Sequence, residues 1–308
     1  MAQYTVPSPI SINGFSVEWE TAKVGLHEVI LHSADAIRDF VPELYNKSDF
    51  KQKTMKKKVY SGLTQAAEWS TDNIISPEAM AFLYDVDATH YFYAKACQYN
   101  LEAKTFDEYD MLKRLPGEVG KALGEKKQRL GAAFFNDGFY TQWKDGRNFF
   151  AADHPFDRRV TGVLSQSNLV EGALCVSTLQ DAINLLINAR DPLGRPMNYL
   201  PKRLWVHPTR VMYARQILGV DMGVEYGTPD RNRNPFRDFT VEVMPFPWFT
   251  STTMWMLQGT DTHTFYSMPV NVTTNVEQTD AHGIKLEGWF ACAFWAEMWQ
   301  GWVGSIGV

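Results

Sequence analysis

Hydrophobic residues recur at helical spacing in the N-terminal part of the chain. Residues 1–24 show little periodicity and predict an extended arm. From residue 26 onward the apolar positions fall near the spacing that places them on one face of an α-helix. The pattern predicts an amphipathic helix of about five turns that ends near Tyr45. Its apolar positions are Leu26, Val29, Ile30, Ile37, Phe40, Val41 and Leu44.

A longer helix is predicted within residues 107–136. The segment Thr105-x-x-Glu108 has the form of a capping box, which is typical of a helix N-terminus. The apolar residues after it again step by three, four or seven. Pro116 disturbs the pattern, and Gly138 follows its last position, where glycine is common at a helix end.

The C-terminal half predicts shorter elements in which helices and strands are mixed. Helices are expected over 177–189 and from Pro208 to Leu218, because proline suits the first helical turn. Apolar side chains alternate from residue 286 to 298, which predicts a two-sided strand. Residues 87–101 fit either a strand or a helix. Short strands are predicted at 203–206, 239–246, 252–257 and 266–274.

Composition narrows the classes of protein that fit this pattern. The chain has 308 residues, enough for two domains or one large one, and 45% are hydrophobic, which excludes a disordered tail protein. With 30 Lys and Arg against 35 Asp and Glu, the net charge of −5 argues against a protein that coats DNA through a basic surface. Aromatic residues reach 14%. Because aromatics fill cores and anchor interfaces, a large self-associating surface is an open possibility.

Two local clusters have alternative explanations. Five lysines lie within residues 51–58, where they form either a solvated charged segment or a contact with an acidic neighbour or nucleic acid. The C-terminal tryptophans form either the core of a sheet or a subunit interface, where tryptophan is enriched. They are Trp289, Trp295, Trp299 and Trp302.

The sequence contains no strong catalytic or metal-binding pattern. Motifs of nucleotide-binding loops, nucleophile elbows and zinc proteases are absent. The cysteines Cys97, Cys175 and Cys292 form no C-x-x-C pair, so buried free thiols are expected. Asp153 and His154 offer one acid/base pair for a hydrolase, although adjacent residues do not usually converge. We therefore predict no catalytic, cofactor or metal residue, no signal peptide and no membrane span.

An ordered series of short motifs is more specific than any one of them. It resembles the major capsid (head) proteins of tailed bacteriophages, especially the Mu-like major head subunit group. The match is good over about 145–260 and extends loosely through 107–136; His207 stands where that group often has proline. The series is Asp145-Gly146-Arg147-Asn148-Phe149-Phe150, Asp153-His154-Pro155, Asn168-Leu169, Asp191-Pro192-Leu193-Gly194, Leu204-Trp205-Val206-His207-Pro208 and Asn234-Pro235-Phe236-Arg237.

The resemblance implies an α+β fold of the Hong Kong 97 capsid type. It implies an N-terminal arm that includes a helix (1–46), an extended loop that lies across a neighbour (47–86), a peripheral domain with a long spine helix near 107–136 (87–168), an axial domain (169–260) and C-terminal strands that return to the body (261–308). Candidate subunit-interface residues follow from this division: Lys53, Lys56, Lys57, Lys58, Trp69, Asp221, Glu225, Arg231, Arg233 and Arg237.

The same resemblance implies a structural protein of the virion rather than an enzyme. Copies would assemble in the host cytoplasm as pentamers and hexamers of an icosahedral shell, which would enclose double-stranded DNA without sequence-specific binding. Portal, scaffold and decoration proteins are the further partners that such a shell can have, and no membrane is involved. Two alternatives remain: a nanocompartment shell of the same fold that encloses a protein cargo, and a hydrolase that uses Asp153 and His154.

Overall fold

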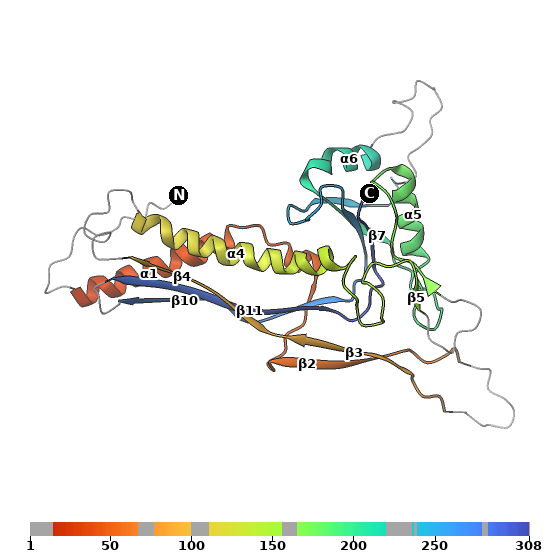
Figure 1. Ribbon diagram of the computed structural model, residues 1–308, viewed down its shortest axis with the longest axis horizontal. Helices are drawn as coiled ribbons and strands as arrows, with labels where there is room; N and C mark the ends of the chain where they lie inside the picture. Colours follow the sequence, from red (N-terminus) through yellow and green to blue (C-terminus); the bar gives the residue numbers. More distant parts are fainter. Residues whose placement is uncertain are drawn as a thin grey trace, which may run out of the picture.

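The computed structural model describes residues 15–66, 77–99, 111–155, 165–219, 236, 239–278 and 283–307. An elongated body carries a four-stranded sheet on which a long helix lies, and a second, more compact part stands at one end (Figure 1). The sheet of the body runs β1 (Asn46–Lys47), β10 (Thr264–Gln278), β11 (Ile284–Ala296) and β4 (Tyr91–Tyr99) in spatial order. β1 is parallel to β10, and the other neighbours are antiparallel.

Helix α4 (Met111–Asp137) covers one face of this sheet. Its buried Val119 and Leu123 pack with Leu286 and Phe290 of β11 in one apolar cluster. These two strand residues have the same parity, so the alternation of β11 turns its apolar side toward the helix. α4 confirms the long helix predicted from the 3.6-residue period and ends at Asp137, next to Gly138.

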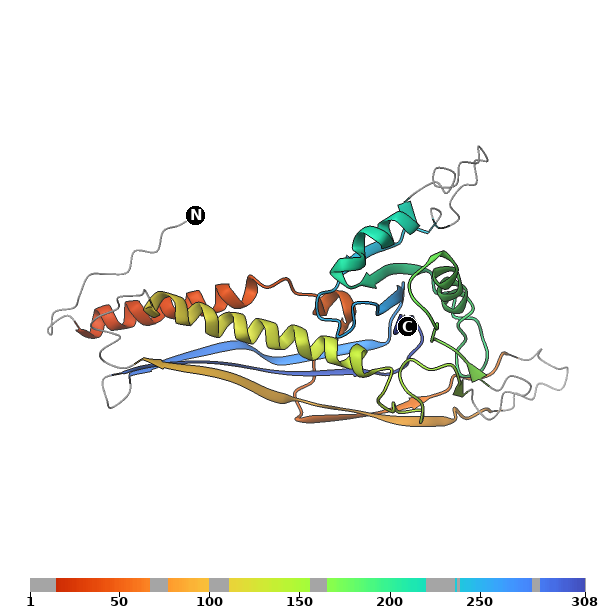
Figure 2. The ribbon, with the colours of Figure 1, turned by 45° about the horizontal axis from the view of Figure 1, so that its top comes forward.

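Helix α1 (Phe15–Asp35) lies beside α4 along the body (Figure 2). Glycines of α4 face it: a Cβ on Gly120 would lie 2.2 Å from the Ile30 carbonyl oxygen, and one on Gly124 would lie 2.7 Å from that of Ala34. The helices can approach so closely because these positions have no side chain. Small residues at the contact therefore set the distance between α1 and α4.

The helix predicted over residues 26–45 is wrong at both ends. α1 begins at Phe15, inside the segment predicted as an extended arm, and stops at Asp35; the single turn α2 (Val41–Leu44) follows. Between them the Phe40 N–H bonds to Gln128 Oε1 of α4 at 3.0 Å, instead of to a carbonyl of its own helix. Pro42 stands in the first turn of α2, a position where proline suits the start of a new helix.

The compact part is built on a second four-stranded sheet. Helix α5 (Val176–Ile187) packs on it through Leu179, Ile183 and Leu186, and α6 (Val211–Gly219) follows a 3₁₀ turn at Pro208–Arg210. α5 and β7 confirm the predictions for these segments. In spatial order the strands are β12 (Trp302–Ser305), β9 (Trp255–Gly259), β7 (Pro201–Val206) and β8 (Glu242–Pro245).

A two-stranded hairpin lies under the body (Figure 1). β2 (Thr54–Tyr60) and β3 (Phe82–Thr89) are antiparallel, and Val59 and Val86 pack on Trp295 of β11. Trp295 has the opposite parity to the residues under α4, so the hairpin covers the other face of the sheet. In the segment 87–101, which fitted either class of element, residues 87–89 form the end of β3 and residues 91–99 form β4.

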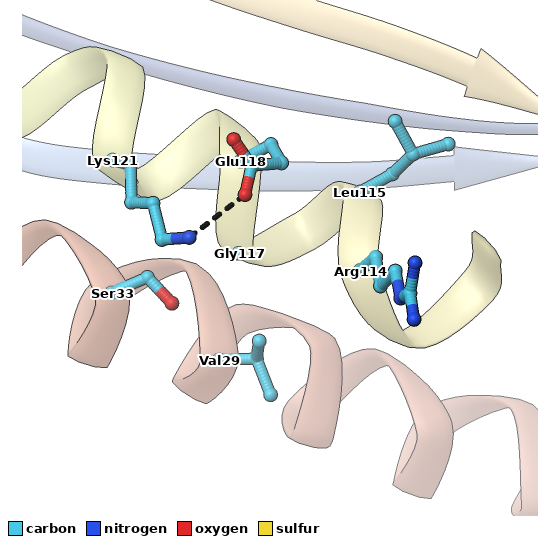
Figure 3. Close-up of a pocket in the computed structure, with 7 residues that line it drawn as sticks. All are labelled: Val29, Ser33, Arg114, Leu115, Gly117, Glu118 and Lys121. Carbon is cyan, nitrogen blue, oxygen red and sulfur yellow. Dashed lines mark hydrogen bonds and ion pairs between the residues drawn. The ribbon is translucent and has the colours of Figure 1, made fainter. Parts of the chain in front are cut away.

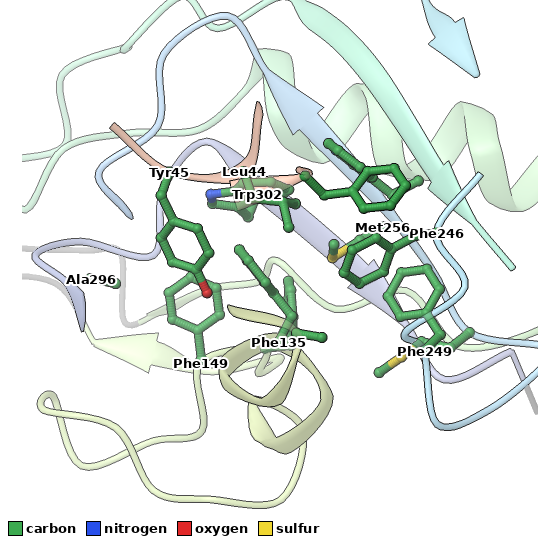
Figure 4. Close-up of a cluster of buried hydrophobic side chains, with 14 of the residues drawn as sticks. Leu44, Tyr45, Phe135, Phe149, Phe246, Phe249, Met256, Ala296 and Trp302 are labelled. Atoms are coloured by element: carbon green, nitrogen blue, oxygen red, sulfur yellow. The ribbon is translucent and has the colours of Figure 1, made fainter. Parts of the chain in front are cut away.

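An aromatic core joins the two parts of the molecule. Phe135 of α4, Phe149 of the loop after it and Trp302 of β12 are almost completely buried in one cluster (Figure 4). The ring centroids of Phe135 and Trp302 lie 4.6 Å apart. Trp295, Trp299 and Trp302 are all buried, so these three tryptophans belong to the core of the subunit. Many of the aromatic side chains therefore lie in the core of the subunit.

Candidate assembly surfaces

His154 in the short strand β5 (His154–Pro155) is fully buried, at 0% exposure. Its Nδ1 lies 2.6 Å from Asp145 Oδ2, and its Nε2 lies 3.1 Å from Asn168 Oδ1. The ring stacks on Trp299, with centroids 4.1 Å apart and planes at 11°. Both nitrogens and one face of the ring are occupied within the chain. The ring therefore ties the loop before β5 to the C-terminal segment.

The hydrolase alternative built on Asp153 and His154 is wrong. The Asp153 carboxylate pairs with the Arg147 guanidinium at 2.9 Å instead of with the neighbouring imidazole. Successive side chains of an extended segment point to opposite sides, which separates the two residues. A general base must lie within hydrogen-bond reach of a substrate. The His154 ring does not meet this condition, because it is fully buried and both of its nitrogens already have partners within the chain.

The described residues hold neither a candidate metal cluster nor a membrane-spanning helix. No group of three or more His, Cys, Asp or Glu side chains is arranged to hold a metal ion in that part of the chain. Among the helices described, none is long and apolar enough to cross a membrane.

Three of the candidate interface lysines lie on β2, opposite acidic groups of the same chain. Lys57 Nζ lies 2.7 Å from Glu297 Oε1, while Lys56 and Lys58 stand directly across from Asp87 and Asp85 in the β2–β3 register. Opposite charges facing each other across two strands stabilise a hairpin. The fourth, Lys53, comes just before β2, and its carbonyl oxygen accepts the His90 N–H at 2.8 Å. A sequence pattern of lysines alone could not show this internal balance of charge.

The base of the hairpin is held against the body by Glu297. Besides its carboxylate contact with Lys57, its carbonyl oxygen accepts the Tyr84 hydroxyl at 2.8 Å. The Tyr84 ring meets Trp143 edge to face, with centroids 5.2 Å apart. Burial raises the pKa of Tyr84 well above its ordinary value, so the phenol stays a donor. Residues from both strands of the hairpin thus meet one residue of the body.

The outer part of the hairpin is held by Arg195, in the loop after α5. Its Nη1 donates to the Leu63 carbonyl oxygen at 3.0 Å, and its Nε donates to Asp191 Oδ2 at 2.7 Å. Asp191 is itself fixed, since its Oδ1 accepts the Leu193 N–H at 2.9 Å. The guanidinium therefore links the hairpin to the compact part through an oriented carboxylate.

We expect Arg195→Ala to loosen the outer part of the hairpin without unfolding the protein. The partly exposed Arg195–Asp191 pair is worth at most about 1 kcal/mol, so the melting temperature should barely change. Amide exchange of peptides over residues 58–66 should become several-fold faster. Arg129→Ala, which removes the exposed pair with Glu125 on α4, is the control. Equal exchange in the two variants would show that Arg195 does not hold the hairpin.

The hairpin and its flanks expose four large apolar side chains, which we call together the hairpin patch. Tyr60 and Phe82 lie edge to face with centroids 6.2 Å apart, and Lys58 Nζ lies 5.7 Å from the Phe82 ring centroid. Several large apolar side chains gathered on one exposed element mark an interaction surface more often than chance exposure does. The members of the hairpin patch are Tyr60, Leu63, Met80 and Phe82.

A groove of about 550 Å³ opens between α1 and α4 (Figure 3). Val29 and Ser33 of α1 form one wall, and Leu115 and Gly117 of α4 lie opposite. The charged groups at its rim are those of Arg114, Glu118 and Lys121, and Lys121 Nζ pairs with Glu118 Oε1 at 2.8 Å. Gly117 has no side chain to fill the groove, and the exposed ion pair at its rim is a surface feature.

Cys175 is the reactive thiol that the structure identifies. It caps α5, with its Sγ 3.1 Å from Ser177 Oγ and 3.3 Å from Thr178 Oγ1. The Ser177 hydrogen bond, followed by those of Thr178, lowers the pKa of Cys175 to about 7. Burial instead raises the pKa of Cys292 to about 12. The expectation of buried thiols therefore holds for Cys292 and not for Cys97 or Cys175, which are half-buried.

We expect iodoacetamide at pH 7 to modify Cys175 at least about a hundredfold faster than Cys292, because the thiolate is the nucleophile. Below pH 7 the rate at Cys175 should rise about tenfold per pH unit, and it should level off above pH 7 as the thiolate becomes the major form. Mass spectrometry of the two peptides between pH 5 and 8 measures both rates. Similar rates at the two cysteines would contradict this environment.

Six of the candidate interface residues lie outside the described residues. They are Trp69, Asp221, Glu225, Arg231, Arg233 and Arg237. The capping box at Thr105 and Glu108 lies outside them as well.

An elongated sheet under a long helix, a compact second sheet and a projecting hairpin define the Hong Kong 97 type of capsid subunit. A family model described as phage capsid protein matches residues 84–305, and the chain belongs to this family. The match does not separate the Mu-like group from other members, so that subgroup stays a prediction. Among curated proteins none matches the chain by sequence.

Solved capsid structures share the fold at low sequence identity. The virus-like particle from Pyrococcus furiosus is 9% identical, with a TM-score of 0.55 over 92% of this chain and 99% of the other. The capsid of cyanophage P-SCSP1u is 9% identical, with a TM-score of 0.57 over 85% and 86%. Mycobacterium phage Che8 is 10% identical, with a TM-score of 0.55 over 88% and 92%. These likenesses confirm the α+β capsid fold.

Proposed function

We propose that this chain is the major capsid protein of a tailed phage and that its copies form pentamers and hexamers of an icosahedral shell around double-stranded DNA. The family match over residues 84–305 carries the proposal. The net charge of −5 fits it, because a strongly basic wall would hold packaged DNA through counterion release. The role is structural rather than enzymatic, in a virion assembled in the host cytoplasm. A portal, a scaffold and decoration proteins would be its further partners.

We propose the following division of labour within the subunit. The arm (1–46) and the extended loop (47–86) reach over neighbouring copies, and the hairpin patch of the loop packs on the adjacent subunit. The peripheral domain (87–168), the axial domain (169–260) and the C-terminal strands (261–308) form the wall. Lys53, Lys56, Lys57, Lys58 and Trp69 would act at the loop contact. Asp221, Glu225, Arg231, Arg233 and Arg237 would act where axial domains meet around a symmetry axis.

A shell that encloses a protein cargo is the second candidate. It is favoured by the likeness to the virus-like particle from Pyrococcus furiosus, which extends over 99% of that chain. A fold similarity at 9% identity does not separate a shell for DNA from a shell for protein. The neighbouring genes distinguish the two candidates: a portal and a packaging motor favour the phage head, and a cargo enzyme favours the nanocompartment.

The assembly itself is tested with the purified full chain. We expect size-exclusion chromatography to show capsomers or larger particles, and electron microscopy to show closed shells, because many weak contacts add up in a multivalent assembly. Protein concentration, ionic strength and pH should each be varied. A stable monomer of 35.2 kDa under all these conditions would contradict the proposal.

A further inference from the structure

Strand β4 forms an open edge of the body's sheet. All nine of its residues stand opposite β11, from Tyr91 across from Cys292 to Tyr99 across from Ile284. In the part of the chain that the structure describes, no other strand pairs with its outer side. A regular strand at the edge of a sheet presents alternate N–H and C=O groups outward, ready to pair with another strand.

The composition of β4 makes this edge suited to pairing. Its nine residues carry one charge, Lys95, and include neither proline nor glycine. Tyr91 is 60% exposed and Phe92 is 70% exposed, and Ala94 and Ala96 are exposed too. Long, apolar and nearly uncharged edges aggregate unless another strand or element covers them.

The other described edge strands that are longer than two residues are protected. β10 carries Pro269 and two register shifts, and α1 reaches it through the contact of His27 with Thr274. The hairpin strands carry lysines on β2 and aspartates on β3. β8 has four residues and ends in Pro245. β12 is joined to residue 169 by a bridge with Gly304. Bulges, prolines, charges and covering segments are the known protections of an edge, and of these β4 has one, the single charge of Lys95.

We propose that the outer edge of β4 pairs with the same strand of a second copy, antiparallel across a twofold axis, so that the sheet continues from one subunit into the next. This inference rests on the proposed function, since a shell supplies the second copy. A contact that uses the same surface on both partners closes by twofold symmetry, and twofold contacts join rings made by head-to-tail contacts. An edge with a single cation per copy offers little to nucleic acid.

Lys95 restricts the register of this pair. If the axis passed through Lys95, two like charges would face each other, which is unfavourable across strands. If the axis passes through Ala94, each Lys95 instead stands beside Tyr93 of the second copy, and Phe92 stands beside its Ala96. Lys126 of the same chain already lies 5.1 Å from the Tyr93 ring centroid, so this register is favoured because it separates the two Lys95 charges and places an aromatic beside a small apolar residue.

Amide hydrogen exchange tests the pairing on the intact protein. Peptides over residues 91–99 should exchange at least about tenfold more slowly in shells than in dissociated subunits, because outward N–H groups become bonded. Peptides over β11, a central strand, should be protected in both states and serve as the reference. Shells in which residues 91–99 exchange as in free subunits would overturn the inference and leave the proposed function intact. A chain that never assembles would overturn both.

A pair of charge variants tests the twofold geometry. Ala94→Lys with Ala96→Lys places three like charges in a row on each copy, and we expect the yield of shells at low salt to fall at least about tenfold, with recovery at high salt. Ala94→Gln with Ala96→Gln, of similar length and uncharged, should assemble as the wild type does. Circular dichroism establishes that both variants fold. Wild-type yield of the lysine variant at low salt would overturn the proposed pairing.

Discussion

Trp302→Ala is expected to lower the free energy of unfolding by about 3–5 kcal/mol, the loss typical of a large aromatic removed from a core. Trp302 is 0% exposed and packs on Phe135 of α4, with centroids 4.6 Å apart. Its strand belongs to the sheet of the compact part, whereas α4 lies on the body, so the ring joins the two. Removal of the indole would leave a cavity where the compact part meets the body. Urea unfolding followed by circular dichroism measures the loss.

Two further variants separate packing from polarity at this site. Trp302→Phe keeps a ring but loses the indole N–H, which lies 3.4 Å from Thr264 Oγ1, so a smaller loss of about 1–2 kcal/mol is expected. Tyr140→Ala, at a position 71% exposed, should change the free energy of unfolding by less than about 0.5 kcal/mol. If Trp302→Ala unfolded at the urea concentration of the wild type, the aromatic core would not join the two parts.

Sequence periodicity predicted the elements whose burial follows a local repeat. α4 and α5 each turn one apolar stripe toward a sheet, and burial alternates over the first half of β11, so the repeat of each segment identifies it. α1 shows the limit of this approach. The apolar stripe read from residue 26 onward continued through residues 36–40, but α1 stops at Asp35, and the Phe40 N–H bonds to Gln128, 88 residues away. A local pattern does not contain such a partner.

The residues of the assembly surfaces were harder to predict, because their partners lie far away in the sequence. The lysine cluster was visible in the sequence, but the carboxylate of Glu297 lies 240 residues beyond Lys57, and only the fold brings the two together. The adjacent Asp153 suggested a partner for His154, whereas the fold supplies Asp145 instead. The open edge of β4 follows from the order of strands in the sheet, which periodicity does not determine. The motif series in the sequence indicated the class of protein. The partners of Lys57 and His154, and the open edge of β4, could be identified only from the structure.

Gly120→Ala should reduce the free energy of unfolding by about 1–3 kcal/mol, the usual penalty of overpacking a close contact. Its new methyl group would lie 2.2 Å from the Ile30 carbonyl oxygen and 2.9 Å from Ser33 Cβ, so α1 must move away from α4. This loss outweighs the gain of up to about 1 kcal/mol that alanine brings to a helix interior. The same change should speed amide exchange in α1, since its contact with α4 would be weakened.

Gly25→Ala is the matched control, because it makes the same chemical change within α1 at a position where the new methyl group would have no atom within 4 Å beyond its neighbours in the chain and the backbone of its own helix. It should stabilise the protein by about 0.4–1 kcal/mol through the reduced freedom of the unfolded chain. The two substitutions therefore have opposite expected signs, and urea unfolding of both measures the difference. If both stabilised the protein equally, the helices would not be in the contact described, and the small residues of α4 would not set their separation.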